Sequence, residues 1–592
     1  MTYKERLAAI RTQMKTDGVS AYIIPSADPH ISEYLPERYK CIYFASGFTG
    51  SAGTLVVTAT FAGLWTDARY FEQAADQLAD TGFELVKMKA QGVPEYIQWL
   101  GEELSKDEVV AFDARLISVQ LAQLLEQQLA PLGLSIASDR NYLDPIWPDR
   151  PPLPVAPAYL ISEEITGKST AEKLKDLRQA LQKQRTQFHL ISSLDDLAWL
   201  FNIRGSDVKC NPVVLCFALI SQDAATLYID LEKLSEQEQG QLQLTGITLQ
   251  PYGEVESALA ALPADASVLI DPKRNCFALY KLLPASVRVV QDTNPTTYFK
   301  AIKNETEVAN TRLTMVKDGV AITKFFKWLE ENIGNIAMSE LSVEERLQQF
   351  RADQDGFIGS SFDTIAGYRA HGALPHYRAT AASNSELQPD GLLLVDSGGQ
   401  YNTGTTDITR VVSLGNLTEE ESVDYTLVLK GMIDGATARF PKGTYGYQID
   451  AITRRPLWEF GRNYGHGTGH GVGFALNVHE GPHVFNPSPT PIAIELGTIT
   501  SVEPGIYRPG RHGIRIENLV LTVPDQENEF GVFYTFEHLT LALIDTAPVK
   551  KDLLEPFHIS WLNAYNQQVV EKLSPYLTEE EQDWLQRKAK AI

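Results

Sequence analysis

Between residues 306 and 350, apolar positions recur at helical spacing and predict two long amphipathic helices; they are Val316, Val320, Ile322, Phe325, Trp328 and Leu329. Strand patterns follow. A short apolar run at 392–395 indicates a buried strand that ends at Asp396, and a second strand is expected at 406–412, after a turn rich in Gly, Asn and Thr. Beyond about residue 549 the pattern is helical and polar.

The first 300 residues repeat one plan. The matching segments are 21–25, 44–47 and 64–71 in the first copy, and 190–192, 200–205 and 227–234 in the second. Each copy offers a strand, a helix, a glycine turn, further strands that end in an aspartate, and another helix, which is an α/β plan of about 150 residues. The alternative is that any two α/β domains share this rhythm. Neither copy carries a cluster of metal-ligand residues.

Two boundaries divide the chain. A proline-dense stretch at 145–154 suits neither a helix interior nor a central strand, which places one boundary near residue 155. Asn304 and Glu307 have the spacing of a capping box that opens a helix, which places the other near residue 304. With 592 residues, the chain exceeds the roughly 250 to 300 that one core supports. We therefore expect domains at 1–155, 156–303 and 304–592.

Composition narrows the classes of function. The chain is 44% hydrophobic and 21% charged, without the ~18 consecutive apolar residues of a membrane helix, so we expect a soluble globular protein. No secretory signal precedes Asp17 and Gly18, which favours a cytoplasmic location. A net charge of −23 without a basic stripe disfavours nucleic-acid binding. Without a CxxC pair, the cysteines are expected to be buried, reduced thiols; they are Cys41, Cys210, Cys216 and Cys276.

Histidines and carboxylates concentrate in one window. Seven of the eleven histidines lie between residues 371 and 512: His371, His376, His466, His470, His479, His483 and His512. Four acids of the same window stand at strand ends and turns: Asp396, Asp407, Glu503 and Glu517. A carboxylate among apolar strand residues is costly unless it is paired or binds a cation. Together these residues favour a metal site, although for any single acid a solvated face or a salt bridge with Arg515 is the simpler interpretation.

A glycine-rich stretch separates two of these histidines. His466 and His470 have the i, i+4 spacing of a zinc-binding helix, but every second residue from 465 to 473 is glycine, which makes a helix implausible. We expect a loop or irregular strand in which the glycines permit close approach of the backbone to a ligand. A phosphate-binding loop is the rival interpretation, but it lacks the Lys-Ser/Thr of a P-loop.

Longer motifs carry a resemblance over essentially the whole chain. They are Trp65-Thr-Asp-Ala-Arg-Tyr70, Phe201-Asn-Ile-Arg-Gly-Ser-Asp207, Asp396-Ser-Gly398, Gly404-Thr-Thr-Asp-Ile-Thr-Arg410, His466-Gly-Thr-Gly-His-Gly471, Asn477-Val-His-Glu-Gly-Pro482, Val502-Glu-Pro-Gly505 and Gly513-Ile-Arg-Ile-Glu-Asn518. With these motifs the chain resembles the aminopeptidase P branch of the pita-bread metallopeptidases, in its long three-domain cytosolic form. The resemblance implies two tandem creatinase-like α/β domains, the second a repeat of the first, followed by an α+β pita-bread catalytic domain.

The same resemblance implies a hydrolase that removes the first residue of peptides with proline at position two. It assigns two divalent metal ions, usually Mn²⁺, to five ligands: Asp396, Asp407, His470, Glu503 and Glu517. It places His376, His466 and His479 at the substrate as catalytic residues, Arg515 behind the ligands, and Arg69 as a candidate substrate contact from the first domain or a partner subunit. A homodimer built by the first two domains is also expected.

The chemistry of the residues agrees with this assignment. Four carboxylates and one imidazole form a hard, oxygen-rich site that suits Mn²⁺, with Co²⁺ and Zn²⁺ as alternatives. Four carboxylates balance two divalent ions and leave room for a bridging hydroxide. Three rivals remain: a non-catalytic relative, which the intact ligand set disfavours; a prolidase, which shares the metal site but takes dipeptides; and a methionine aminopeptidase, which lacks the N-terminal domains.

Overall fold

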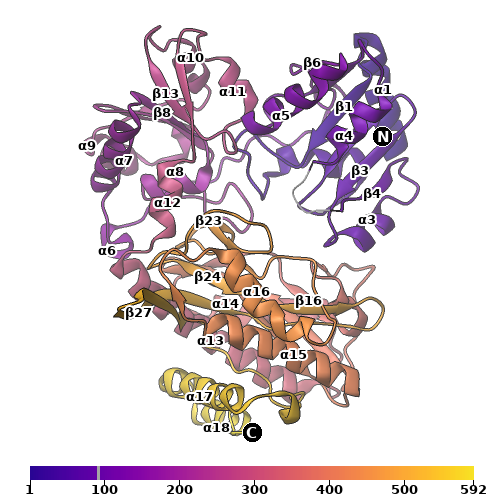
Figure 1. Ribbon diagram of the computed structural model, residues 1–592, viewed down its shortest axis with the longest axis vertical. Coiled ribbons are helices and arrows are strands. Elements are labelled where there is room, and N and C mark those ends of the chain that lie inside the picture. Colours follow the sequence, from indigo (N-terminus) through magenta and orange to yellow (C-terminus); the bar gives the residue numbers. More distant parts are fainter. Residues whose placement is uncertain (90–93) are drawn as a thin grey trace. The chain divides into compact units, whose positions relative to one another are not determined.

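The computed structural model describes residues 1–89 and 94–592, which form two compact units. The first unit contains residues 1–162 and 168–297, and the second contains residues 163–167 and 298–592. Each unit is built from its own sheets and helices (Figure 1). Among the described residues, no helix combines the length and the apolar character that crossing a membrane requires. The domain boundaries expected near residues 155 and 304 stay predictions.

The first sheet of the first unit has the strand order β4-β3-β2-β1-β5-β6. Its strands are β1 (Ala21–Pro25), β2 (Thr54–Thr58), β3 (Ala62–Thr66), β4 (Glu84–Lys87), β5 (Val109–Phe112) and β6 (Ser135–Ala137). Side chains alternate across a strand, so Tyr22 and Ile24 of β1 pack into one apolar cluster and Ala21 and Ile23 into another. Helices complete both clusters, chiefly α1 (Tyr3–Asp17), α4 (Tyr96–Glu103) and α5 (Val119–Leu129).

The second sheet repeats the first. Its order is β12-β11-β10-β8-β13-β14, with β8 (Phe188–Ile191), β10 (Cys216–Ser221), β11 (Ala225–Ile229), β12 (Ile247–Gln250), β13 (Ser267–Ile270) and β14 (Arg288–Gln291). In both sheets the central strand pairs antiparallel with one neighbour and parallel with the other, and the first edge pair is parallel. This identical topology confirms the predicted repeat of an α/β plan.

The second unit opens with two helices, as predicted. Asn304 and Glu307 form the capping box of α13 (Glu305–Asn332), and α14 (Glu340–Ala352) follows after a short connection. Their apolar faces meet in one cluster, to which α13 contributes Phe325 and Leu329 and α14 contributes Val343 and Leu347. The capping residues and the period of the apolar positions therefore predicted these helices correctly.

The strands of this unit form three sheets and a hairpin, and one of these sheets joins β15 (Phe357–Ser360), β18 (Gly399–Tyr401) and β19 (Gly404–Thr405). A second three-stranded sheet contains β16 (Ile365–Tyr368), β17 (Leu392–Ser397) and β20 (Ile408–Ser413). A six-stranded sheet has the order β21-β28-β27-β24-β22-β23, with β21 (Phe440–Pro441), β22 (Gly469–Gly471), β23 (Glu480–Phe485), β24 (Ile499–Val502), β27 (Asn518–Asn528) and β28 (Gly531–His538). The hairpin pairs β25 (Gly505–Arg508) with β26 (His512–Arg515). The sheet that contains β17, the six-stranded sheet and α15 (Glu419–Ala436) share the main apolar core of the unit.

The strand expected at 406–412 is present, but it begins two residues later, at Ile408. Residues Gly404–Thr405 form β19 and pair with β18 (Gly399–Tyr401), whereas β20 begins at Ile408 and pairs with β17. The chain therefore moves from one sheet to another at Thr406 and Asp407. This step releases Asp407 from the ladder, which a continuous strand would not have allowed.

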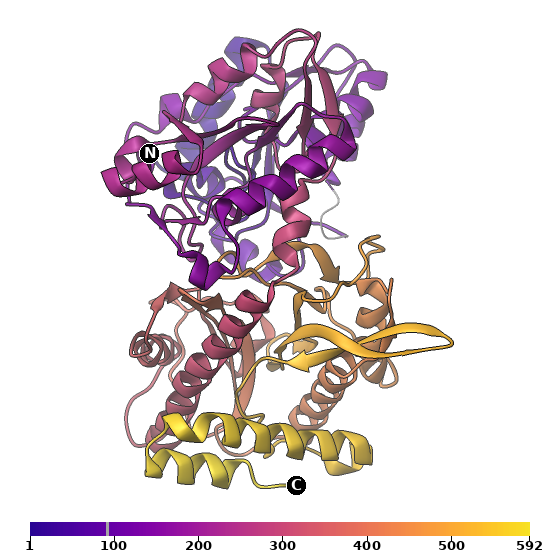
Figure 2. The same ribbon diagram turned by 90° about the vertical axis from the view of Figure 1, so that its left-hand side faces the viewer.

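The C-terminal tail consists of α17 (Pro556–Leu573) and α18 (Glu579–Lys588), which lie side by side in Figure 2. The sequence predicted polar helices, and the structure adds that Leu562, Val569 and Trp584 join the main core. Of the four cysteines, three are buried as expected, but Cys210 is partly exposed because it lies in a turn with positive φ.

Candidate metal centre

Five residues predicted as metal ligands come from the ends and edges of strands in the second unit. Asp396 lies near the end of β17, Asp407 precedes β20, His470 is the middle residue of β22, Glu503 follows β24, and Glu517 lies between β26 and β27. The sheets carry them to one place although they span more than 100 positions of the sequence. Antiparallel pairing of β17 with β20 and of β24 with β27 is what brings these ends together.

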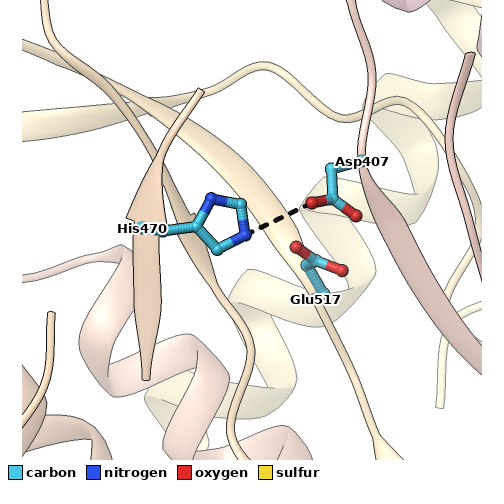
Figure 3. Close-up of side chains that lie close together, drawn as sticks. All are labelled: Asp407, His470 and Glu517. Carbon is cyan, nitrogen blue, oxygen red and sulfur yellow. Dashed lines mark ion pairs between the residues drawn. The ribbon is translucent and has the colours of Figure 1, made fainter. Parts of the chain in front are cut away.

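The side chains of Asp407, His470 and Glu517 face one another (Figure 3). His470 Nε2 lies 3.4 Å from Asp407 Oδ2 and 3.6 Å from Glu503 Oε1. Ligand atoms of Asp407, His470 and Glu517 all lie within 4.8 Å of one another. Asp396 joins them through Arg515, whose Nη2 donates to its Oδ2 at 2.5 Å while Nε lies 4.0 Å from Glu503. The structure thus brings all five predicted ligands together.

Glycines on both sides of His470 let its strand approach its neighbours. A Cβ at Gly469 would lie 1.8 Å from the Ser501 carbonyl oxygen, and one at Gly471 would lie 2.3 Å from the Glu480 carbonyl oxygen. The expectation that these glycines serve close approach to a ligand was wrong for this pair, because neighbouring backbone fills the space. His470 Nδ1 donates to the carbonyl of Gly471 at 2.9 Å, so Nε2 is the ring nitrogen that faces the carboxylates.

Burial and crowding of like charges perturb the acids. Burial raises the pKa values of Asp396 and Glu517, and raises the pKa of Glu503 to about 7 against the opposing effect of His470 and Arg515. Burial lowers the pKa of His470, but the neighbouring carboxylates outweigh it and raise that pKa to about 9. The four acids therefore exceed the positive charge that the protein itself supplies.

Two carboxylate oxygens of this cluster are in a position to bind a cation. Among the described residues, Asp396 Oδ1 and Glu517 Oε1 are buried and have no hydrogen-bond partner in the protein. An oxygen buried in this way costs free energy unless something binds it. With four carboxylates and one imidazole, the donor set is the oxygen-rich type that divalent ions such as Mn²⁺ prefer. The residues present therefore fit a pair of divalent metal ions.

His466 lies at the edge of the cluster and is held by a chain of hydrogen bonds. Its Nδ1 donates to the Gly467 carbonyl at 2.7 Å, because a carbonyl can only accept. Its Nε2 lies 2.8 Å from the Tyr507 hydroxyl, which itself accepts from Arg515 Nη1 at 2.6 Å. The hydroxyl proton of Tyr507 therefore points to His466, and both ring nitrogens of this histidine are engaged.

The other two predicted histidines also come close to the ligands. The ring of His479 stands edge-on to the ring of His470, with centroids 4.3 Å apart. His376 is partly buried and follows Pro375, whose carbonyl accepts from Arg515 Nη2 at 3.3 Å. Arg515 thus connects the segment that carries His376 to Asp396. These contacts place the His479 ring against a predicted ligand and the backbone before His376 against Arg515, and the catalytic roles of both histidines stay predictions.

The two arginines singled out by the sequence have different surroundings. Arg515 contacts a ligand directly, as described above. Arg69 belongs to the first unit, where its Nε and Nη2 donate to the two oxygens of Asp67, both at 2.8 Å. Its guanidinium fork is therefore used within its own domain, and a contact with substrate stays a prediction.

Several functional neighbours were not found from the sequence. Thr409 donates to Glu517 Oε2 at 2.8 Å and is paired with Asp396 in the β17–β20 ladder. Tyr507 orients His466, as described above. A threonine or tyrosine in a strand carries no local signal for such a role, because the register of distant strands decides it. Three other histidines of the window have structural contacts instead: His371 with Glu340, His483 with Thr500 and His512 with Asp424.

Family models match the chain almost from end to end. Two descriptions of the creatinase/prolidase N-terminal domain match residues 6–139 and 149–307. Metallopeptidase family M24 matches residues 309–524, which contain all five predicted ligands, and the C-terminal region of peptidase M24 matches residues 532–592. These matches agree with two creatinase-like domains followed by a pita-bread domain.

Full-length relatives share this organisation. The chain is 39% identical to a probable Xaa-Pro aminopeptidase P of Neurospora crassa, over 98% of this chain and 88% of the relative, and 39% identical to one of Sordaria macrospora, over 98% of both. The crystal structure of X-prolyl aminopeptidase from Caenorhabditis elegans, described as a cytosolic enzyme with a di-nuclear active site, is 34% identical, with a TM-score of 0.96 over all of both chains. The chain belongs to the Xaa-Pro aminopeptidase P family of M24 metallopeptidases.

Proposed function

We propose that this chain is an Xaa-Pro aminopeptidase whose second unit hydrolyses the bond between the first residue of a peptide and a proline at position two. The observation that carries the proposal is the convergence of five ligand residues with two buried oxygens that lack a partner. Such a cluster is too rich in negative charge to serve packing alone. The relatives with the same domain order are named for this activity.

Two divalent ions are proposed for the site, with Mn²⁺ as the first choice and Co²⁺ or Zn²⁺ as alternatives. Asp396, Asp407, Glu503 and Glu517 supply oxygens, and His470 supplies Nε2. When bound, such ions supply Lewis acidity and activate water at neutral pH. The fixed direction of His470 Nε2 and the support of Asp396 by Arg515 give the protein control of ligand geometry.

Each of the three histidines around the ligands has its own proposed role in the reaction. His376 donates a hydrogen bond to the developing oxyanion or carries a proton to the leaving amine, because an imidazole titrates in the required range. His479 lies against His470 and bounds the substrate space. His466 contributes its ring face, since Tyr507 and Gly467 engage both of its nitrogens.

Selectivity for proline follows from the chemistry of the bond. A peptide bond to proline is a tertiary amide without an N–H, so a site that recognises this bond through that donor cannot take it. Imidazole faces and edges accept a flat proline ring without requiring a donor. We place the free α-amine of the first residue near the acidic groups and the proline ring among His376, His466 and His479. Peptide beyond the proline is proposed to extend toward the N-terminal domains, where Arg69 is a candidate contact.

Four peptides test the reaction. X-Pro-Y should be cut well, X-Ala-Y poorly, N-acetylated X-Pro-Y not at all, and the X-Pro dipeptide slowly. Efficient cleavage of the acetylated peptide overturns the aminopeptidase assignment, and a preference for the dipeptide moves it to prolidase. Metal analysis of the same preparation should give two divalent ions per chain, with activity lost to a chelator and best restored by Mn²⁺.

Assembly and location complete the proposal. We propose a homodimer formed by the first two domains, which sedimentation at micromolar concentration tests directly; a monomer under these conditions contradicts it. A cytoplasmic location is proposed from the relative described as cytosolic. The net charge of −23 supports small peptides as partners over nucleic acid.

A further inference from the structure

His376 stands on a stretch of irregular backbone. We call residues 369–384 the His376 segment. It begins with a 3₁₀ turn, Arg369–Ala373, and lies in the connection between β16 and β17. After that turn it forms no regular helix or strand. Irregular segments lack the hydrogen-bond ladder that fixes a strand and are usually the more mobile parts of a fold. A catalytic imidazole on such a segment needs another means of fixation, since displacement by about 1 Å can cost 10²-fold in rate.

One buried carboxylate supplies that fixation. Glu340, the first residue of α14, is 0% exposed and is not one of the five predicted metal ligands. Its Oε1 accepts from the Tyr368 N–H at 2.8 Å, and its Oε2 accepts from the Ser385 N–H at 2.8 Å. These two N–H groups lie immediately before and after the His376 segment. Glu340 therefore joins the two ends of the segment.

The same carboxylate also holds two side chains inside the segment. His371 Nδ1 lies 2.8 Å from Oε1, and the Tyr377 hydroxyl donates to Oε2 at 2.8 Å. The rings of His371 and Tyr377 are stacked with centroids 4.4 Å apart. The Glu340 N–H in turn donates to the Ser385 carbonyl at 3.1 Å. Four donors converge on a single carboxylate at a helix N-terminus, where the helix dipole also favours negative charge.

The opposite side of the segment meets the metal cluster. The Pro375 carbonyl accepts from Arg515, which also holds Asp396. Gly372 packs so closely on β26 that a Cβ at Gly513 would lie 1.6 Å from its carbonyl oxygen. His376 thus sits between Pro375, fixed from the metal side, and Tyr377, fixed by Glu340.

We infer that Glu340 is a positioning residue that acts through His376: it sets the segment so that this imidazole reaches the reacting peptide. The inference rests on the role of His376 in the proposed function. It differs from a general contribution to folding, because it requires the loss of Glu340 to matter for turnover only while His376 is present.

Glu340→Gln is the test variant. Whichever way the amide is turned, its NH₂ group replaces one oxygen and faces the N–H of either Tyr368 or Ser385, so one end of the segment loses its acceptor. We expect kcat for an X-Pro-Y peptide to fall about 10- to 100-fold, with KM and metal content close to those of the wild type. Asp196→Asn is the matched control: Asp196 is also 0% exposed and accepts from Asn294 and Thr297, but it belongs to the first unit. It should lower the melting temperature and leave kcat unchanged.

A double-mutant cycle with His376→Ala separates the outcomes. If Glu340 acts through His376, adding Glu340→Gln to His376→Ala leaves kcat where the single His376 variant had it. Multiplying losses refute the positioning role and leave the proposed function intact. A His376→Ala variant with full kcat instead refutes the role of His376 in the proposed function, and the inference falls with it. Loss of metal in Glu340→Gln also contradicts the inference, since it would place the effect on the ligands.

Discussion

Replacing Glu517 by glutamine separates metal binding from folding. Glu517 is 1% exposed, and burial together with three neighbouring carboxylates raises its pKa well above the ordinary range. Without metal, this side chain therefore takes up a proton more readily than an ordinary carboxyl group, and glutamine imitates the protonated form in shape and charge. We expect Glu517→Gln to leave the free energy of unfolding of the metal-free second unit within about 1 kcal/mol of the wild type.

The metal-loaded proteins should differ strongly. A ligand present at 100 times its dissociation constant stabilises the folded state by about 2.7 kcal/mol. In a unit of this size one kcal/mol corresponds to about 2 °C, so metal should raise the wild-type melting temperature by roughly 5 °C and that of the variant by much less. Turnover should fall about 10³-fold or more, because metal catalysis contributes several kcal/mol and each 1.36 kcal/mol is a factor of ten.

Calorimetry with and without Mn²⁺, metal analysis and peptide cleavage on the same samples measure these quantities. Asp424→Asn is the matched control, since it makes the same chemical change at a carboxylate of the same unit that Arg462, Arg508 and His512 already neutralise. That variant should keep its metal and lose stability. A Glu517→Gln protein with two ions per chain and full turnover refutes the ligand assignment.

Three further predictions follow from contacts of the second unit. Asp424→Asn should lower the free energy of unfolding by about 2 kcal/mol, because the buried carboxylate loses the charge that holds its hydrogen bonds to the partly exposed Arg462 and Arg508 and to His512. Burial raises the pKa of Asp424, but His512 and the two arginines outweigh it and lower that pKa. The stabilisation is therefore present above the ordinary carboxyl range and is lost as the pH falls, which acid titration of wild type and variant measures. Mn²⁺ should raise the melting temperature more at pH 8 than at pH 6. The pKa of Glu503 is raised to about 7, so the metal-free fold loses stability as the pH rises. An equal effect of Mn²⁺ on the melting temperature at both pH values contradicts this. Tyr507→Phe should lower kcat about tenfold with metal content unchanged, since the hydrogen bond from Tyr507 to His466 is lost. Reduced metal content in this variant would show instead that Tyr507 supports the metal ligands.

The sequence predicted what local patterns determine. The capping box at Asn304 and the apolar period predicted the two helices, and the resemblance of motifs predicted the five ligand residues that the structure brings together. Asp407 was placed inside a strand because a run of Thr, Ile and Val favours strand conformation. Its true position depends on the change of partner from β18 to β17, which no local pattern encodes.

Residues that orient the site were the hardest to predict. Glu340 is 36 positions from His376 and looks like an ordinary acid in the first turn of a helix. Its role becomes visible only when β16 and the residues after the His376 segment fold against that helix. The glycines beside His470 show the same limit, because the sequence indicates close approach but not which backbone approaches.

Strand-end acids that support the fold differ in local charge from those that are proposed to bind metal. In the first unit Asp67 and Asp113 follow strands, and each binds an arginine two residues further on: Arg69 at 2.8 Å and Arg115 at 2.6 Å. Such an acid is neutralised by its own turn and has no need of an ion. The residues two positions after the four proposed ligand acids are Gly398, Thr409, Gly505 and Leu519, none of which carries charge. These acids must therefore be neutralised by groups that are distant in the sequence. Within the described contacts of the cluster, the positive groups of the second unit that pair with them are Arg515 and the imidazole of His470. Two divalent ions would fill this deficit of positive charge.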